Sequence, residues 1–140
     1  MVVRKQHFSM RLSAETIERL TRDAARSGQP KTALAERYLE EGMRMAQHPG
    51  VVFRQGPAGR RAGLPGHRLD IWEIIETVRN EDGDLARAAA YLDVAPHLVA
   101  TALDYYADYP AEIDDWIARN SAIAEEAESS WRRREDIANR

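Results

Sequence analysis

The hexapeptide at residues 7–12, HFSMRL, constrains the fold most, because its side chains alternate between apolar and polar. The apolar set is Phe8, Met10 and Leu12, and the polar set is His7, Ser9 and Arg11. A period of two predicts a β-strand with one apolar face and one polar face. A lone strand has no partner for its backbone hydrogen bonds, so the pattern also predicts that two copies of the chain pair here.

Two helical patterns follow this predicted strand and run to about Ala46. Ser13 is a good N-cap for the first helix, and Gly28 stands where helices commonly end. A segment of about 45 residues is near the lower limit at which a chain buries enough apolar surface by itself. Two antiparallel strands covered by four helices would solve this, and such a ribbon fits the major groove of DNA.

The strand HFSMRL, the cap Ser13 and the helical segments AETIERLTRDAARSG and QPKTALAERYLEEGMRM together resemble the ribbon-helix-helix family of the Arc, MetJ and CopG type. The resemblance covers about a third of the chain. It implies a homodimer through the N-terminal strand, with operator DNA as the ligand. It also implies that His7, Ser9 and Arg11 read bases, and that the backbone around Pro30, Lys31 and Thr32 holds a phosphate. The family usually opens its second helix with a Ser or Thr cap, whereas Gln29 and Pro30 stand here.

Charge divides the chain into a basic part and an acidic part. Residues 1–47 carry nine Lys or Arg against six Asp or Glu, a net +3, and residues 48–140 carry eleven against seventeen, a net −6. Arg4 and Lys5 lie in an N-terminal arm, residues 1–6, that is expected either to touch the DNA backbone or to be a loose basic terminus. The two parts are therefore expected to have different functions.

The rest of the chain is predicted to be mostly helical. We expect domain 1–48 to be followed by a Gly/Pro-rich linker with a possible hairpin at 49–69 and a helical domain at 70–119. A charged tail at 120–140 completes this division. Asp70 and Glu73 have the spacing of a capping box, and Gly83, Asp84, Pro96 and Pro110 mark helix ends and starts. The expected fold class is thus mostly α: a ribbon-helix-helix unit of one strand and two helices, a helix-turn-helix-like domain and a helical tail.

The segment LARAAAYLDVAPHLVATALDYY is similar to a helix-turn-helix, but its charge argues against a second DNA reader. From Asp84 to Tyr109 the chain has one basic residue, Arg87, against four aspartates, so a structural or protein-binding role is favoured. Residues 51–117 also resemble a small domain of unknown function that is found in VapB-like antitoxins.

The tail places Trp131 beside Arg132, Arg133 and Arg134, residue types that are enriched at interface hot spots. The segment has too few apolar residues to bury itself, so it is expected either to fold against a partner or to be a solvated helix end.

These features predict a type II antitoxin that binds its own operator and neutralises a toxin. The resemblance implies a PIN-type ribonuclease whose acidic metal site an arginine would block. The alternative is a free-standing ribbon-helix-helix repressor with no toxin. An enzyme is not expected, because the four histidines have no metal-ligand spacing and no nucleophile motif is present. No cofactor, metal or membrane contact is expected, and a chain without cysteines and without a long apolar run is placed in the cytoplasm.

Overall fold

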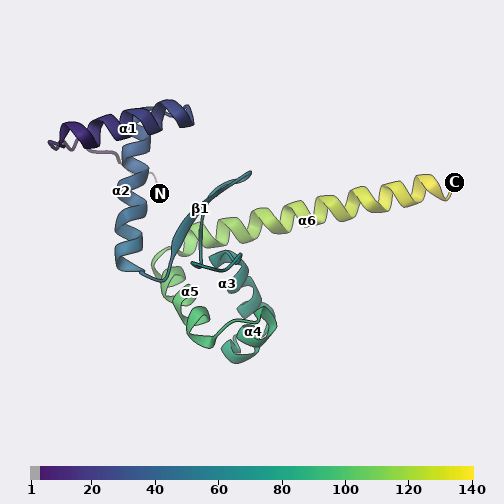
Figure 1. Cartoon of the computed structure of the whole chain (residues 1–140). Coiled ribbons are helices and arrows are strands. Elements are labelled where there is room, and N and C mark those ends of the chain that lie inside the picture. The colour runs from purple at the N-terminus through teal and green to yellow at the C-terminus, as the bar shows by residue number, and fades with distance from the viewer. Residues whose placement is uncertain (1–3) are drawn as a thin grey trace. The chain divides into compact units, whose positions relative to one another are not determined.

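The computed structural model describes residues 4–140, which form six α-helices and two β-strands (Figure 1). The first three residues of the predicted basic arm and of the predicted domain 1–48 lie outside the described residues. The chain divides into two compact units, Met1–Arg44 (unit 1) and Met45–Arg140 (unit 2).

Unit 1 contains α1, Ala14–Ser27, and most of α2, Lys31–Gln47. The predicted ends of α1 are confirmed. The Ser13 hydroxyl accepts a hydrogen bond from the backbone N–H of Thr16 at 3.1 Å. Gly28 ends the helix with φ of 66°, in the left-handed region that glycine enters without a steric penalty.

The predicted N-terminal strand is wrong, and the ribbon-helix-helix fold class fails with it. Residues 4–13 adopt no regular secondary structure, and the sheet lies mid-chain, at residues 52–63. Alternation only shows that a segment could present two different faces, whereas a strand exists through its hydrogen bonds to a neighbouring strand. This segment pairs with no strand among residues 4–140, and the apolar side chains of Phe8, Met10 and Leu12 are 77%, 55% and 40% exposed.

The sheet is a hairpin of β1, Val52–Gly56, and β2, Gly59–Gly63, which pair antiparallel. Arg54 stands opposite Arg61 in the register. An isolated bridge between Gly63 and Asp70 then connects the hairpin to the start of the next helix. The hairpin lies within residues 49–69, the segment expected to be a Gly/Pro-rich linker with a possible hairpin.

Four further helices complete unit 2: α3, Ile71–Asn80; α4, Leu85–Leu92; α5, Pro96–Asp108; and α6, Pro110–Ala138. The predicted helix starts are confirmed, because Asp70 forms a capping box with Glu73 and the Asp84 side chain accepts from the backbone N–H of Arg87. Pro96 and Pro110 each open a helix, at the position where a missing N–H costs nothing.

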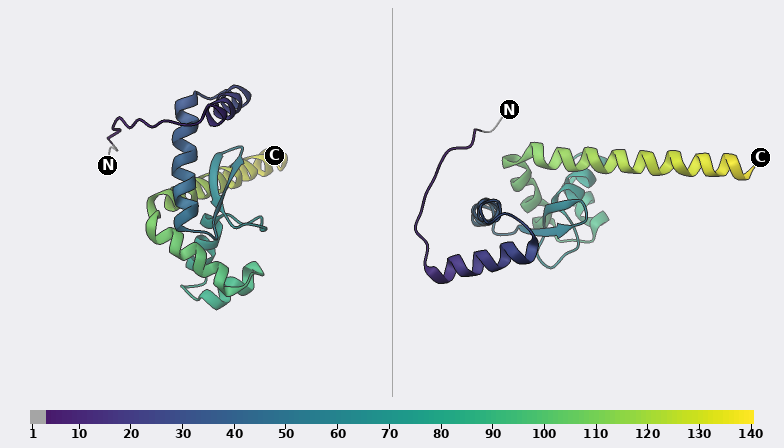
Figure 2. Two further views of the ribbon diagram at one scale, coloured as in Figure 1. Left: turned by 60° about the vertical axis from the view of Figure 1, so that its left-hand side comes forward. Right: turned by 90° about the horizontal axis from the view of Figure 1, so that it is seen from above.

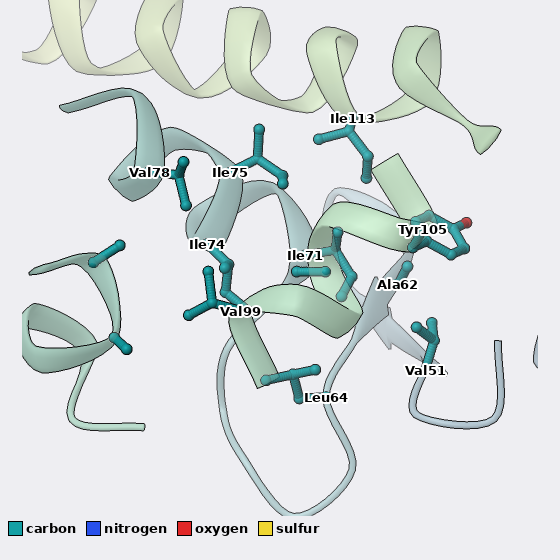
Figure 3. Close-up of a cluster of buried hydrophobic side chains, with 13 residues drawn as sticks. Val51, Ala62, Leu64, Ile71, Ile74, Ile75, Val78, Val99, Tyr105 and Ile113 are labelled. Atoms are coloured by element: carbon teal, nitrogen blue, oxygen red, sulfur yellow. The ribbon is translucent and has the colours of Figure 1, made fainter. Parts of the chain in front are cut away.

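The core of unit 2 gathers apolar side chains from the hairpin region and all four helices (Figure 3). Leu64 and Ile71 are fully buried, and Tyr105 places its ring in the same cluster. The buried members are Val51, Ala62, Leu64, Ile71, Ile74, Ile75, Val78, Ala88, Ala89, Val99, Ala102, Tyr105 and Ile113.

Helix α6 is 29 residues long, and only its first part packs against the rest of unit 2. Ile113 belongs to the core, and Trp116 and Ile117 are partly buried. Residues 120–138, which we call the distal half of α6, continue the helix without a break and extend away from the body of the unit (Figures 1 and 2).

Candidate functional site

The residues predicted to read DNA bases are exposed. His7, Ser9 and Arg11 lie in the irregular segment that precedes α1, and their neighbours Phe8, Met10 and Leu12 are exposed with them. Because residues 4–13 form no strand, these side chains lack the fixed alternation that the sequence predicted. The structure therefore shows that they are accessible.

An open groove of about 620 Å³ runs along this segment within unit 1. Four residues of the predicted DNA-contact set line it, namely Arg4, Lys5, His7 and Thr32. Lys5 also contacts Glu36 of α2, with 3.1 Å between Nζ and Oε2. The structure thus brings the basic arm and the first turn of α2 to one groove, whereas Ser9, Arg11 and Lys31 do not line it.

The N-terminus of α2 has the features that favour a phosphate. The helix begins at Lys31, and both Lys31 and Thr32 are exposed. The first backbone N–H groups of a helix have no partner within the helix and carry a partial positive charge. A cationic side chain at this position adds to that field, so the end of α2 suits an anion.

A second groove in unit 1, of about 320 Å³, is lined mainly by apolar side chains. Its walls include Met10, Leu12, Leu20, Tyr38 and Leu39. In the sequence, the helical spacing of Leu34, Tyr38, Leu39 and Met45 predicts a buried stripe on α2. The prediction is correct for Leu34, which is 1% exposed, but not for Tyr38, Leu39 and Met45, which are 46%, 49% and 37% exposed. Among the described residues of unit 1, the only buried apolar side chains are those of Ala24 and Leu34.

The predicted protein-binding residues lie on the distal half of α6. Trp131 is 58% exposed, and Arg132, Arg133 and Arg134 are exposed beside it. Arg132 forms an intrahelical ion pair with Glu128 at 2.5 Å, and Arg133 donates to the Ser130 hydroxyl at 3.1 Å. These contacts are at the surface, where such pairs are weak, so a partner can displace them at small cost.

Sequence reasoning missed a buried ionic cluster at the start of α3. In the sequence, Arg60, Arg61, His67 and Arg68 form a basic cluster that is expected on the surface of the hairpin. The Arg61 Nε instead lies 2.5 Å from the carboxylate of Asp70, whose side chain is 6% exposed. Arg54 lies 3.5 Å from the same carboxylate and donates to the carbonyl oxygens of His67 and Leu69. The opposed positions of Arg54 and Arg61 in the hairpin explain this arrangement, and a sequence without a known register does not reveal it.

Glu73 lies next to this cluster and has a raised pKa. Burial is the main cause, because it disfavours the charged carboxylate, and the charge of Asp70 acts in the same direction. A hydrogen bond from the backbone N–H of Asp70, at 3.3 Å, and the charges of Arg61 and Arg54 oppose the shift.

A second polar cluster joins α3, α5 and α6 at the surface. Arg79 donates to Asp114 at 2.6 Å and to the Tyr106 hydroxyl at 2.7 Å. The hydrogen bond from Arg79 is the main reason why the pKa of Asp114 is lowered, and the hydrogen bond from Tyr106 adds to it. This cluster fixes the first part of α6 to the body of unit 2.

His48, directly after α2, is the centre of a third polar cluster. Its Nε2 lies 2.7 Å from a carboxylate oxygen of Asp108, and its ring meets the ring of Tyr105 edge-on at 5.3 Å between centroids. Tyr109 donates to the side chain of Gln47 at 3.0 Å. These contacts tie the residues at 47–48 to the junction of α5 and α6.

Within residues 4–140, no group of three or more acidic or histidine side chains is arranged to hold a metal ion. The described helices include none with the length and apolar character that a bilayer crossing requires. Comparisons with protein-family models, curated proteins and solved structures found no match for the chain.

Proposed function

We propose that the chain is an antitoxin-type regulator with two binding surfaces, one in each unit. In this proposal unit 1 binds operator DNA as a homodimer, and the distal half of α6 binds and neutralises a protein toxin. The observation that carries the proposal is that each unit exposes a large set of apolar and basic side chains.

The deficit of buried apolar surface in unit 1 supports a homodimer. From residue 4 to the end of unit 1, only Ala24 and Leu34 are buried apolar residues, whereas seven large hydrophobic side chains of α1, α2 and the N-terminal segment are at least 40% exposed. Those seven are Phe8, Met10, Leu12, Ile17, Tyr38, Leu39 and Met43. A unit this small with so thin a core needs a partner to cover its surface. A second copy is the occupant we propose, because its identical apolar groove would supply matching surface.

The charge of unit 1 supports DNA as its ligand. Its net +3 per chain becomes +6 in a dimer, while unit 2 is net −6 and would be repelled by phosphates. Arg4, Lys5 and Lys31 supply cations for contacts with the phosphates of the DNA backbone. The N-terminus of α2 adds a site for one phosphate. Arg11, with its forked donors, is the residue we propose for a guanine contact.

The exposed end of α6 supports a protein partner. Most of the stability of a helix in a protein comes from tertiary packing, and no core residue of unit 2 lies in the distal half of α6, so contact with another surface would add to its stability. Trp131 supplies apolar contact area, and the adjacent arginines can bind carboxylates bidentately. The partner that fits this chemistry is a protein with an acidic cleft, and a ribonuclease with an acidic metal site, such as a PIN-type toxin, meets that requirement.

Co-expression with the neighbouring reading frame tests the proposal. We expect that frame to encode a small ribonuclease-like protein that stops growth alone and not together with this chain. If the neighbouring product is harmless and does not bind the chain, the antitoxin role is wrong, and a free-standing repressor becomes the better account.

A further inference from the structure

Apart from Trp131, the large exposed apolar residues of the distal half of α6 lie on one seam of heptad spacing, which also carries Ser130 and Arg134. Ile123, Ala127, Ser130, Arg134 and Ile137 follow one another at alternating intervals of four and three residues. Ile123 and Ile137 are 64% and 70% exposed. Spacing of this kind places side chains along one seam of a helix, as in helices that pack side by side. The same seam begins with Ile113, a core residue of unit 2, and continues through Trp116, which is partly buried.

We propose that the distal half of α6 pairs antiparallel with the distal half of α6 in a second copy. In the register we infer, Ala127 faces Ser130 of the second copy, and Ile123 faces Arg134 of the second copy. The two small residues at the centre allow close approach of the helices. The aliphatic part of the Arg134 side chain can cover Ile123 while its guanidinium reaches water.

Charge complementarity selects this antiparallel arrangement. The same register places Glu126 beside Arg133 of the second copy, and Arg133 beside Glu126 of the second copy, on the edges of the seam. It also places the exposed ring of Trp131 over Ala124 of the second copy. A parallel pair would instead stack Arg134 on its own counterpart within the seam, where like charges repel.

Contacts within the helix agree with this choice of seam. The ion pair between Glu128 and Arg132, at 2.5 Å, lies on the opposite side of the helix and would stay in water. The inferred register overlaps residues 120–138 alone, which are the residues that extend from the body of unit 2 (Figure 1). The two bodies would therefore lie at opposite ends of the pair and would not collide.

Cysteine cross-linking in the full chain tests this pairing, because the chain contains no cysteine of its own. One preparation carries Ala127→Cys and a differently tagged one carries Ser130→Cys. We expect oxidation of the mixture to give a mixed disulfide dimer in several-fold higher yield than either preparation alone. Dimers formed equally well by each preparation alone would indicate a parallel pair, and the absence of any cross-link would show that α6 does not self-associate; either result overturns the proposal.

Charge exchange on the seam provides the matched control. In the cross-linking background, Glu126→Arg or Arg133→Glu alone should lower the yield about fivefold, since each change replaces two attractive pairs with two repulsive ones. The double variant restores opposite charges and should recover the yield. Glu125→Arg, on the outer side of the helix, should have little effect. Equal effects of the Glu125 and Glu126 changes would contradict the inferred register.

This inference does not depend on the proposed function, because it uses α6 alone. The two proposals nevertheless share Trp131, Arg133 and Arg134, so a toxin and a second α6 would compete for them. If the neighbouring gene product is present during oxidation and lowers the yield of the cross-linked dimer, the result would support both proposals. An unchanged cross-link beside full toxin binding would place the toxin elsewhere on the chain and leave the pairing intact.

Discussion

Ile113 and Ile123 stand ten residues apart on α6, and their environments are opposite: the first is 1% exposed and the second is 64% exposed. One continuous helix thus passes from the core of unit 2 into solvent while it keeps apolar residues along its length. Burial of Ile113 anchors the helix. The exposed apolar residues beyond it are available to another molecule.

Deletion of residues 120–140 should therefore remove partner binding and leave the rest of the chain folded. None of the core residues of unit 2 lies beyond Ile113, and the partly buried residues packed on the core end at Ile117. We expect growth protection to be lost, DNA affinity to be unchanged and the melting temperature of the truncated chain to be close to that of the full chain. A truncated chain that still protects cells from the toxin would refute the role of the distal half of α6.

Self-association through unit 1 should depend on the apolar side chains that line its grooves. Leu39 is 49% exposed and lines both grooves, so Leu39→Asp should weaken the dimer about tenfold or more without disturbing the core. Analytical ultracentrifugation of the truncated chain, which lacks the distal half of α6, measures this directly. Leu85→Asp, at a residue of unit 2 that is 41% exposed, is the matched control and should leave the association unchanged.

The buried carboxylate of Asp70 should matter more for stability than an exposed one. Asp70→Asn leaves Arg54 and Arg61 without their anionic partner, and we expect a loss of about 2 to 4 kcal/mol in the free energy of unfolding. Asp114→Asn, which removes the exposed partner of Arg79, should cost clearly less, because water screens a surface ion pair. Denaturant unfolding of both variants makes the comparison. Equal losses would show that burial of the Asp70 cluster contributes nothing.

The raised pKa of Glu73 predicts a specific pH dependence. The folded chain holds this proton more tightly than the unfolded chain, for which the pKa is 4.5, so stability from this group is lost as pH rises through the folded pKa. Glu73→Gln removes the titration and keeps a side chain that can complete the capping box. We expect the stability of this variant relative to the native chain to increase as pH rises above 4.5. A constant difference across that range would contradict the shift.

Local signals in the sequence predicted the helices of this chain well. Ser13, Gly28, Asp84, Pro96 and Pro110 each act within a few residues of their own position, and each marks the helix end or start that it predicted. Capping and the proline ring are local effects, so the rest of the chain does not need to be known to read them.

Features that depend on contacts between distant parts of the chain were harder to predict from the sequence. The pattern of residues 7–12 predicted a strand, but a strand requires a neighbour that residues 4–140 do not supply. Arg61 was expected at the surface of the hairpin. Its ion pair with Asp70 depends on the register of the two strands, which the sequence does not reveal. Exposure of Leu39 and Tyr38 could not be foreseen either, since their spacing is that of a buried stripe.

DNA binding by unit 1 is the central claim, and the affinity of the full chain for the DNA upstream of its own gene, measured over a series of salt concentrations, tests it most directly. We predict a steep loss of affinity as salt increases, because cations of unit 1 displace counterions from phosphates. We also predict that Arg11→Ala weakens binding by ~1 to 3 kcal/mol, as expected for loss of a base contact, while Arg119→Ala in unit 2 does not. Affinity that is weak, independent of salt and unchanged by Arg11→Ala would contradict the claim.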